Sequence, residues 1–247
     1  MEQSILQVKD NRQIARGIYR MILTGSFSGP LQPGTFANIR VEGHFLRRPI
    51  SLCDVSEKEI TLIYRVMGKG TEDMSRIQAG QKLDVLLGLG NGYHPEDAGQ
   101  NPLLVGGGVG APPLYLLAKR LIASGLPSGN IQVILGFRRA EEIFLEEEFR
   151  ALGCRLLLAT EDGSYGSRGL VTDAMPEEGY SYIYACGPSA MLKAVWEKSA
   201  GGGEFSFEER MGCGFGLCMG CSHKTVGGYK RICKEGPVLR KGEILWD

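Results

Sequence analysis

A chain of 247 residues is long enough for two compact domains and a small appendage. Its 28 Lys and Arg residues balance its 28 Asp and Glu residues, and a net charge of zero argues against general attraction to nucleic acid or to an anionic membrane. No apolar run approaches the roughly 20 residues that cross a bilayer, and the N-terminus does not open a signal peptide, so we expect a cytoplasmic protein without nucleic-acid or membrane partners.

The first third of the chain has the pattern of short strands separated by turns. Alternating or β-branched runs occur at residues 4–8, 19–24, 37–41, 60–66 and 83–87. Turns are expected at Gly29-Pro30 and Pro33-Gly34 among other places. Because no helix of normal length fits between these runs, residues 1–98 are predicted to form a small antiparallel β-barrel. Such a barrel binds a ligand at its rim or across its outside.

Two short segments of this barrel could hold phosphate groups. Arg48-Pro49-Ile50-Ser51 sets an arginine fork and a hydroxyl three residues apart, and both can reach one pyrophosphate. Ile63-Tyr64-Arg65 is followed by Gly70-Thr71, a turn near the start of a short helix expected at residues 72–77. A helix N-terminus is a natural phosphate seat. Each segment alone is also compatible with a surface charge or an ordinary turn.

Strands and helices alternate after residue 101. Strands are expected at residues 103–105, 131–137, 155–159 and 181–185, and helices at residues 114–122, 140–152 and 188–198. This alternation predicts a parallel, doubly wound sheet over residues 99–203.

The first strand of this sheet runs into a glycine-rich turn. Residues 106–111 match the dinucleotide fingerprint G-x-G-x-x-A, which makes Gly107, Gly108 and Gly110 candidate cofactor-binding positions. Cys186-Gly187-Pro188 ends the fourth strand. The carboxyl-end rule for open α/β sheets brings it beside the glycine turn, where its thiol could contact a nicotinamide or simply pack.

The end of the second strand lacks the acidic residue that usually holds the ribose 2′-hydroxyl of NAD. Arg138 and Arg139 follow Phe137 instead. These arginines could favour the 2′-phosphate of NADP, or they could be solvated charges ahead of two glutamates. Sequence therefore leaves the choice between NAD and NADP open.

Four cysteines dominate the last part of the chain, residues 204–247, which begins with a strand at residues 204–207. Cys213, Cys218, Cys221 and Cys233 have the spacing C-x4-C-x2-C…C, the spacing of plant-type [2Fe–2S] ligation. The intervening glycines allow a loop to fold around a small cluster and let backbone N–H groups approach its sulfurs. A zinc site, disulfides or a Rieske-like site using His223 are weaker alternatives, because the loop has only one tight cysteine pair and one histidine.

A flavin-type barrel, a nicotinamide-type α/β domain and a C-terminal [2Fe–2S] loop, in this order, resemble the ferredoxin reductase superfamily. More narrowly, the chain resembles the electron-transfer subunits of type B, NAD-linked dihydroorotate dehydrogenases of pyrimidine biosynthesis. The resemblance covers nearly the whole chain. Its most specific segments are residues 48–51, 63–65 with 70–71, 106–113, 186–188, 208–214 and 233–238.

The resemblance implies roles for these segments. Arg48 and Ser51 would take the pyrophosphate of FAD, residues 63–65 and 70–71 would line the flavin and its phosphates, and the four cysteines would ligate one [2Fe–2S] cluster. Electrons would pass from the FMN of a catalytic partner subunit through the cluster and FAD to NAD⁺, in an α2β2 heterotetramer.

Elementary chemistry agrees with this order of cofactors. A nicotinamide moves two electrons as hydride and a [2Fe–2S] cluster moves one, so a flavin must sit between them. A (β/α)₈ barrel alone takes about 250 residues, so dihydroorotate oxidation would reside on the partner. Similar modules occur in subunits of sulfide dehydrogenases, hydrogenases and NADPH–ferredoxin transhydrogenases, which remain alternatives. A zinc-stapled binding module is a second alternative from another class.

Overall fold

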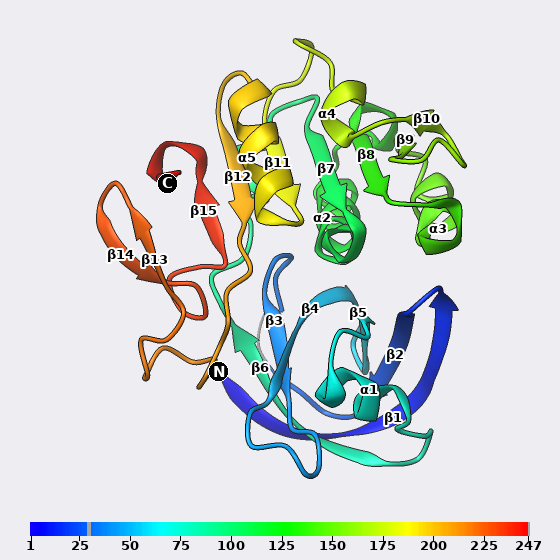
Figure 1. Ribbon diagram of the computed structural model, residues 1–247, viewed down its shortest axis with the longest axis vertical. Helices are drawn as coiled ribbons and strands as arrows, with labels where there is room; N and C mark the ends of the chain where they lie inside the picture. Colours follow the sequence, from blue (N-terminus) through cyan, green and yellow to red (C-terminus); the bar gives the residue numbers. More distant parts are fainter. Residues whose placement is uncertain (29–30, 247) are drawn as a thin grey trace.

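The N-terminal third of the chain forms a closed barrel that lies below a helix-flanked sheet (Figure 1). The computed structural model describes residues 1–28 and 31–246, so the turn predicted at Gly29-Pro30 lies outside the described residues. The barrel strands are β1 (Glu2–Ala15), β2 (Ile18–Thr24), β3 (Phe36–Ile39), β4 (Arg48–Val55), β5 (Glu59–Arg65) and β6 (Lys82–Leu89). They pair in the order β1-β2-β5-β4-β3-β6, each pair antiparallel, which confirms the predicted barrel.

The alternation of side chains along β5 gives the barrel wall two apolar faces. Leu62 and Tyr64 point into the barrel core, and both are at most 2% exposed. Ile63 points the other way. It packs in a second core together with helix α2 (Ala111–Ala123), which belongs to the domain of the helix-flanked sheet, called the upper domain below. The barrel and the upper domain therefore share a buried apolar contact along this strand.

Helix α1 (Lys69–Ser75) joins β5 to β6. It begins three residues before the predicted start because Gly68 is extended and the Thr71 hydroxyl accepts the N–H groups of Met67 and Gly68. Thr71 thus closes the first turn of the helix.

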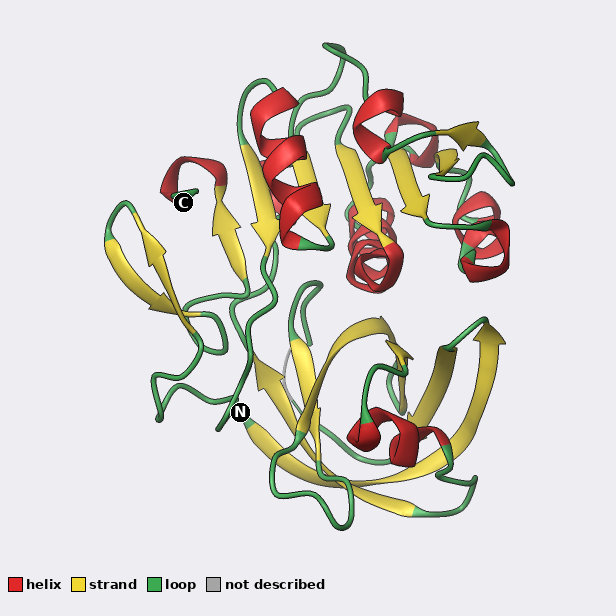
Figure 2. Ribbon diagram, in the orientation of Figure 1, coloured by secondary structure: helices red, strands yellow, loops and turns green. Residues whose placement is uncertain are grey.

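The upper domain is a seven-stranded sheet covered on both faces by helices (Figure 2). Its strands are β7 (Leu103–Gly107), β8 (Gln132–Phe137), β9 (Arg155–Thr160), β10 (Ser167–Arg168), β11 (Ile183–Cys186), β12 (Gly203–Ser206) and β15 (Val238–Arg240), in the order β10-β9-β8-β7-β11-β12-β15. All pairs are parallel except the last. Helices α2 and α3 (Glu146–Ala151) pack on one face, and α4 (Val171–Ala174) and α5 (Ser189–Lys198) on the other, which confirms the doubly wound prediction.

One predicted helix, at residues 140–152, is wrong as a continuous element. The chain instead forms the 3₁₀ turn η4 (Ala140–Glu142) and then α3, with Leu145 left-handed at φ 64° between them. The break lets Phe144 and Leu145 turn into the core, where Phe144 packs edge-on against Phe137 at 5.5 Å. Burial of two large apolar side chains outweighs the helix propensity of the flanking glutamates.

The last part of the chain contributes to the sheet and also projects from it. Strand β15 and all but the first residue of β12 lie within the range predicted for the cluster subdomain, yet both strands belong to the seven-stranded sheet. The predicted domain limits themselves stay a prediction. The hairpin of β13 (Ser222–Thr225) and β14 (Gly228–Arg231) stands apart at the left of Figure 1. Further 3₁₀ turns are η1 (Pro95–Asp97), η2 (Gly108–Gly110), η3 (Ser128–Asn130) and η5 (Lys241–Glu243). None of the helices in the described parts of the chain has the length and apolar character needed to traverse a bilayer.

Candidate functional site

The four cysteine thiols gather as two neighbouring pairs. Cys213 and Cys218 each direct their backbone N–H at the other's sulfur, with N···Sγ distances of 3.4 Å. Cys221 and Cys233 form the second pair, in which the Cys233 N–H lies 3.4 Å from the Cys221 Sγ. In residues 1–28 and 31–246, no three His, Cys, Asp or Glu side chains lie close enough to hold a single metal ion. Two thiols for each of two irons is the arrangement that a [2Fe–2S] cluster uses.

The loop that carries the first cysteines surrounds the sulfurs with backbone donors. The Leu217 N–H approaches the Cys213 Sγ at 3.2 Å, and the Gly216 N–H approaches the Cys233 Sγ at 3.1 Å. Gly216 has φ +89°, and a Cβ there would lie 2.5 Å from the Lys234 side chain. Only glycine fits this turn, so the loop suits a cluster whose sulfurs accept backbone hydrogen bonds.

The environments of the two pairs differ in polarity. Partial burial raises the pKa of the Cys213 thiol, but backbone N–H groups from residues 215, 218 and 217 outweigh it and lower the pKa to about 6. Burial, followed by the neighbouring Cys221, raises the pKa of Cys233 to about 12. Cys218 is exposed, whereas Cys221 and Cys233 are at most 3% exposed. One pair therefore faces solvent and the other faces the protein.

Asn38 of barrel strand β3 anchors the loop that carries the first three cysteines, residues 213–221, called the cysteine loop below. Its amide Nδ2 donates to the Cys213 carbonyl at 3.3 Å, and its side chain is 1% exposed. A Cβ on Gly214 would lie 2.2 Å from that Nδ2, so the loop packs directly on Asn38. Asn38 is also the cross-strand partner of Pro49 in the Arg48–Ser51 segment. The cysteine loop and that segment are thus neighbours across one strand.

Arg48 lies over the first turn of α1. A Cβ on Gly70 would sit 1.9 Å from its guanidinium, so this close approach requires glycine. Arg48 Nη2 lies 2.9 Å from Nδ1 of His44, whose Nε2 lies 2.8 Å from Asp73 Oδ2. Because a guanidinium only donates, Nδ1 accepts and Nε2–H donates to the carboxylate. Arg48 is thus held at the first turn of α1 and is linked through His44 to the Asp73 carboxylate.

The remaining barrel residues of the predicted site lie on two different faces of their strands. Ile50 packs toward the barrel core, so Ser51 lies on the outer face. Tyr64 is buried inside the barrel, stacked on Tyr19 with its hydroxyl donating to Asn11 at 2.9 Å. Ile63 and Arg65 face outward. Of these side chains, those of Ser51 and Arg65 can reach a ligand outside the barrel, whereas Ile63 is buried against α2.

The structure brings the glycine turn and the Cys186-Gly187 turn together. A Cβ on Gly110 would lie 2.0 Å from the Cys186 carbonyl oxygen, and a Cβ on Gly187 would lie 3.1 Å from the Gly107 N. Cys186 ends β11 next to β7, and its thiol is 3% exposed. Burial, and then the Glu208 carboxylate, raise the pKa of Cys186 to about 12, so it stays a neutral thiol.

An acidic residue lies close to the two arginines that follow β8. Arg139 Nε lies 4.0 Å from Asp162 Oδ2, and the Asp162 N–H donates to the Arg138 carbonyl. Asp162 comes from the loop after β9, so an acid does stand near the end of the second strand. Sequence reasoning missed it because the fingerprint looks for that acid on β8 itself.

Other residues that shape the site carry no motif. Arg65 Nη2 pairs with Glu142 Oε2 at 3.0 Å, across the junction of the two domains. The linker after β6, residues 90–94, is hydrogen-bonded to the upper domain at three points. Asn91 donates to β15, the Tyr93 hydroxyl donates to β11, and the His94 N–H donates to the buried Glu204 carboxylate. These are contacts between residues far apart in sequence, and no local signal indicates them.

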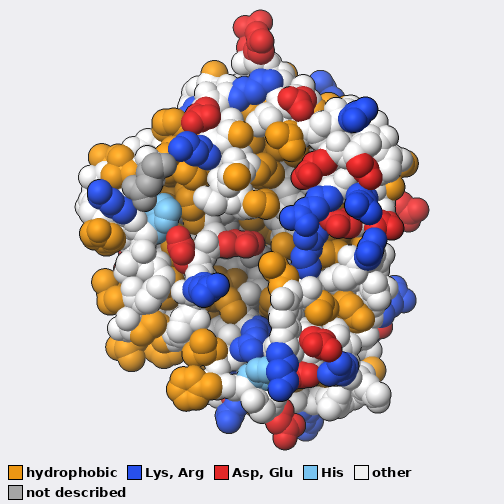
Figure 3. Space-filling model, in the orientation of Figure 1, with side chains coloured by type: hydrophobic (Ala, Val, Ile, Leu, Met, Phe, Trp, Pro, Cys, Tyr) orange, Lys and Arg blue, Asp and Glu red, His pale blue; other side chains and the backbone are white. Residues whose placement is uncertain are grey.

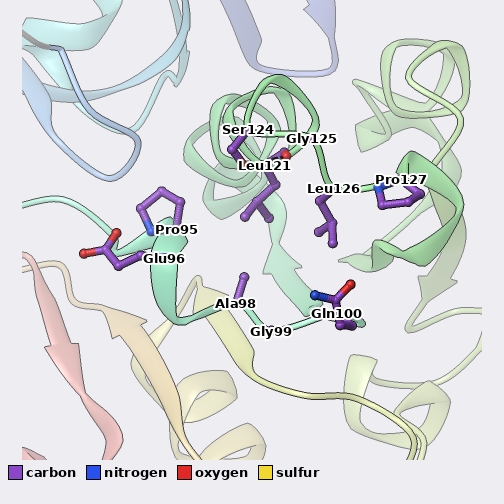
Figure 4. Close-up of a pocket in the computed structure, with 10 residues that line it drawn as sticks. All are labelled: Pro95, Glu96, Ala98, Gly99, Gln100, Leu121, Ser124, Gly125, Leu126 and Pro127. Atoms are coloured by element: carbon purple, nitrogen blue, oxygen red, sulfur yellow. Dashed lines mark hydrogen bonds between the residues drawn. The ribbon is translucent and has the colours of Figure 1, made fainter.

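Two surface hollows lie away from the cysteines. One of about 800 Å³ borders the Arg48 network and is lined by Arg40–Phe45, Asp73, Arg76–Ile77 and Gln81–Asp84. The other, of about 340 Å³, lies between η1 and the C-terminal end of α2 (Figure 4). The glycine turn is at the other end of that helix. Ala98, Leu121 and Leu126 converge on this hollow in that view, and the residues that line it include no cysteine.

Two family profiles match the chain. Residues 104–197 match the oxidoreductase NAD-binding domain, and residues 208–245 match the iron-sulfur cluster binding domain of dihydroorotate dehydrogenase B.

Full-length similarity extends to known proteins. The chain is 43% identical over 255 residues to the dihydroorotate dehydrogenase B (NAD(+)), electron transfer subunit of Geobacillus thermodenitrificans (strain NG80-2), with 97% of each chain covered. It is 40% identical over 264 residues to the protein of the same name from Bacillus cereus (strain G9842), with 99% of each covered. Among solved structures, the NADH-dependent reduced ferredoxin-NADP oxidoreductase superposes with a TM-score of 0.88 at 31% identity, covering 98% of this chain and 90% of that one.

Proposed function

Because the chain belongs to the family of electron transfer subunits of dihydroorotate dehydrogenase B, we propose that it carries electrons from a catalytic partner subunit to NAD⁺. The route runs through a [2Fe–2S] cluster and FAD. The chain is an oxidoreductase subunit, and the oxidation of dihydroorotate itself belongs to the partner.

The observation that carries this proposal is the contact between the cysteine loop and the barrel. Asn38 hydrogen-bonds to the Cys213 carbonyl and pairs in the sheet with Pro49, beside the proposed FAD segment. One buried side chain therefore ties the proposed cluster ligands to the proposed flavin ligands. A chain that only used zinc to hold its fold together would have no need for this junction.

The proposed cofactor ligands follow from the geometry of the barrel. Arg48 and the first turn of α1 would hold the FAD diphosphate, and the Ser51 hydroxyl would approach the cofactor from the outer face of β4. FAD supplies the exchange between hydride and single electrons. Cys213, Cys218, Cys221 and Cys233 would hold the two irons, and backbone N–H groups at residues 216 and 217 would adjust the charge on their sulfurs.

The glycine turn and the Cys186 turn would form the nicotinamide side of the site. Their backbones are close enough that a ligand at the carboxyl ends of β7 and β11 touches both. The buried, neutral Cys186 thiol would present a non-nucleophilic surface to a nicotinamide ring.

We further propose that the catalytic partner carries FMN, docks on the cysteine loop and assembles with this chain as an α2β2 heterotetramer in the cytoplasm. Around the exposed Cys218, the side chains of Phe215, Leu217 and Met219 are 38%, 77% and 53% exposed. Three exposed apolar side chains on the cysteine loop are suited to burial against a partner. Docking here would bring the donor to the exposed pair of thiols.

Anaerobic purification, absorbance, low-temperature EPR before and after dithionite, and flavin extraction test the proposal. We expect about one FAD per chain and a one-electron [2Fe–2S] signal. With the FMN-containing partner added, dihydroorotate should reduce NAD⁺. A colourless, EPR-silent protein that retains zinc would reject the proposal.

A second candidate is an electron-transfer subunit of another complex, of which the NADPH–ferredoxin transhydrogenase type has a specific observation in its favour. The solved structure of the NADH-dependent reduced ferredoxin-NADP oxidoreductase is similar over nearly the full length. The two functions differ in the electron donor. Affinity purification of the chain from its own cells should recover an FMN-containing dihydroorotate-oxidising subunit, and recovery of a ferredoxin-linked subunit instead would favour the second candidate.

A further inference from the structure

We infer that the buried Glu204 carboxylate is a positioning group for the exchange of hydride between FAD and the nicotinamide, because it holds His94 and thereby fixes the linker between the two domains. This inference rests on the proposed function. It assigns a role to two residues that lie outside the segments proposed to hold FAD, the cluster or the dinucleotide.

Glu204 is a carboxylate enclosed within the upper domain. It lies on β12 between Tyr184 of β11 and Arg240 of β15, and its side chain has no exposed surface. The Arg240 side chain is 55% exposed and pairs with Asp97 of η1 at 2.8 Å. Other carboxylates lie on the surface beside basic side chains, as at the right of the face in Figure 3. A buried carboxylate, in contrast, must be compensated by hydrogen bonds from its immediate neighbours.

Two hydrogen bonds reach the Glu204 carboxylate from one linker residue, His94. The backbone N–H donates to Oε2 at 2.9 Å, and the ring Nδ1 lies 2.5 Å from Oε1. Because an ionised carboxylate only accepts, Nδ1 carries the hydrogen. Burial raises the pKa of the Glu204 carboxyl, and the hydrogen bonds from His94 act in the opposite direction. His94 therefore stabilises the ionised form of Glu204.

The upper domain also holds the carbonyl of His94. The Tyr184 hydroxyl donates to this carbonyl at 2.7 Å, so the N–H, the carbonyl and the ring of His94 are all bound to β11 or β12. A buried charge adds little net stability, because the cost of its desolvation offsets the attraction of its partner. It tolerates few alternative arrangements, since a shift leaves the charge unpaired. The His94–Glu204 pair is therefore suited to setting the position of the linker more than to stabilising the fold.

Tyr93, the residue before His94, connects this position to both sides of the proposed site. Its N–H donates to the carbonyl of Pro33, in the loop between β2 and β3, at 2.8 Å. Its hydroxyl donates to the carbonyl of Ala185 at 3.0 Å, directly before Cys186 on β11. A shift of His94 would move Tyr93 and change the spacing between the barrel and the Cys186 turn. Transfer between two bound groups is sensitive to a misplacement of about one ångström.

Three variants separate the charge of the pair from its hydrogen bonds. His94→Leu removes the ring donor and leaves the Glu204 carboxylate with the backbone N–H. Glu204→Gln removes the charge, and its amide still pairs with both groups of His94 once the imidazole takes its other tautomer. The double variant has neither the ring donor nor the buried charge. Asp97→Asn is the matched control, because it breaks the neighbouring ion pair between η1 and β15 and leaves His94 in place.

The first measurement is single-turnover reduction of the flavin by saturating NADH, on the flavin- and cluster-loaded protein. We expect His94→Leu to slow this step about 10- to 100-fold. FAD content and ADP-ribose affinity should stay unchanged, because the variant alters spacing and removes no ligand. Glu204→Gln should stay close to the wild-type rate. The double variant should recover most of the lost rate, since no unpaired charge remains to displace the linker.

Backbone hydrogen exchange gives a second readout that needs no electron transfer. The amides of residues 91–98 should exchange about tenfold faster in His94→Leu than in the wild type, because the linker opens more often. They should exchange at the wild-type rate in Glu204→Gln. The amides of the cysteine loop should not change in either variant.

Three results would overturn the inference. These are an unchanged rate of flavin reduction in His94→Leu, an equal loss of rate in Asp97→Asn, and a His94→Leu defect that the double variant does not relieve. If His94→Leu does not fold, Glu204→Asp decides the question, because it keeps the charge on a shorter side chain and should also slow flavin reduction. A protein that binds neither FAD nor NADH would reject the proposed function, and the hydrogen-exchange comparison would still decide whether Glu204 fixes the linker.

Discussion

The substitution Gly110→Ala tests how closely the glycine turn packs against the Cys186-Gly187 turn, and whether NADH binding depends on that packing. The Gly110 backbone has φ −78°, which alanine adopts freely, so the effect is steric. The new Cβ would lie 2.0 Å from the Cys186 carbonyl oxygen and 2.8 Å from the Gly187 N. Non-bonded carbon atoms prefer about 3.5–4 Å, so the turns must separate by more than an ångström.

Overpacking of this kind costs about 1–3 kcal/mol, and the upper end applies because the obstacle is backbone. A loss of about 3 kcal/mol corresponds to a fall in Tm of about 6–12 °C for a chain of this size. NADH affinity should fall at least about tenfold, since a misplacement of one ångström loosens every contact in the site.

Thermal unfolding and NADH titration of Gly110→Ala measure both effects. Gly129→Ala is the matched control, because a Cβ on Gly129 meets nothing within 4 Å and its φ is not left-handed. The control should keep its Tm and its NADH affinity. A Gly110→Ala protein as stable and as tight-binding as the control would refute the packing of the two turns described above.

Three further predictions concern the cysteine loop and the barrel. Cys221→Ser should abolish partner-dependent NAD⁺ reduction while FAD stays bound, measured by turnover and flavin extraction; loss of FAD with a retained cluster would contradict the ligand assignment. Asn38→Asp should weaken the attachment of the loop by about 1–3 kcal/mol, because it buries a charge facing the Cys213 carbonyl. Chelator-driven cluster loss should then be faster than in the wild type, and an equal rate would count against Asn38 as the anchor. Hydrogen bonds from Arg47 lower the pKa of Asp84, so the stability they provide is present above the ordinary carboxyl pKa of about 4 and is lost as pH falls below it. Urea unfolding should find Asp84→Asn about 1–2 kcal/mol less stable than wild type at pH 7 and closer to it at pH 3, whereas an unchanged gap would contradict the linkage.

Sequence reasoning was most successful where one local pattern dictates one local structure. The strand, glycine turn and helix over residues 103–123 follow from apolar runs and backbone freedom, and the structure has β7 and α2 there. The cysteine spacing likewise brings the thiols together, because three of them share one short loop. Each of these signals lies within about twenty residues of chain, so no knowledge of the tertiary fold is needed to interpret it.

Sequence patterns are least informative where a distant residue decides the outcome. The break at Leu145 depends on burial against the core, which the glutamate-rich sequence around it does not indicate. The position of Tyr64 inside the barrel depends on strand register, since a shift of one residue would exchange it with Ile63. The ion pair of Arg65 with Glu142 depends on how the two domains meet.

The linker after β6 shows why such contacts matter for function. Asn91 is hydrogen-bonded to β15 at 2.7 Å, the Tyr93 hydroxyl to β11 at 3.0 Å, and the His94 N–H to the buried Glu204 carboxylate at 2.9 Å. The linker thereby binds the segment after the last cysteine and the nicotinamide-side sheet to the end of the barrel. A protein that moves electrons between bound groups must fix the distances between them, and the fold does this by positioning. Because one short segment touches all three parts, a change in the linker should alter transfer between sites without removing a ligand from any of them.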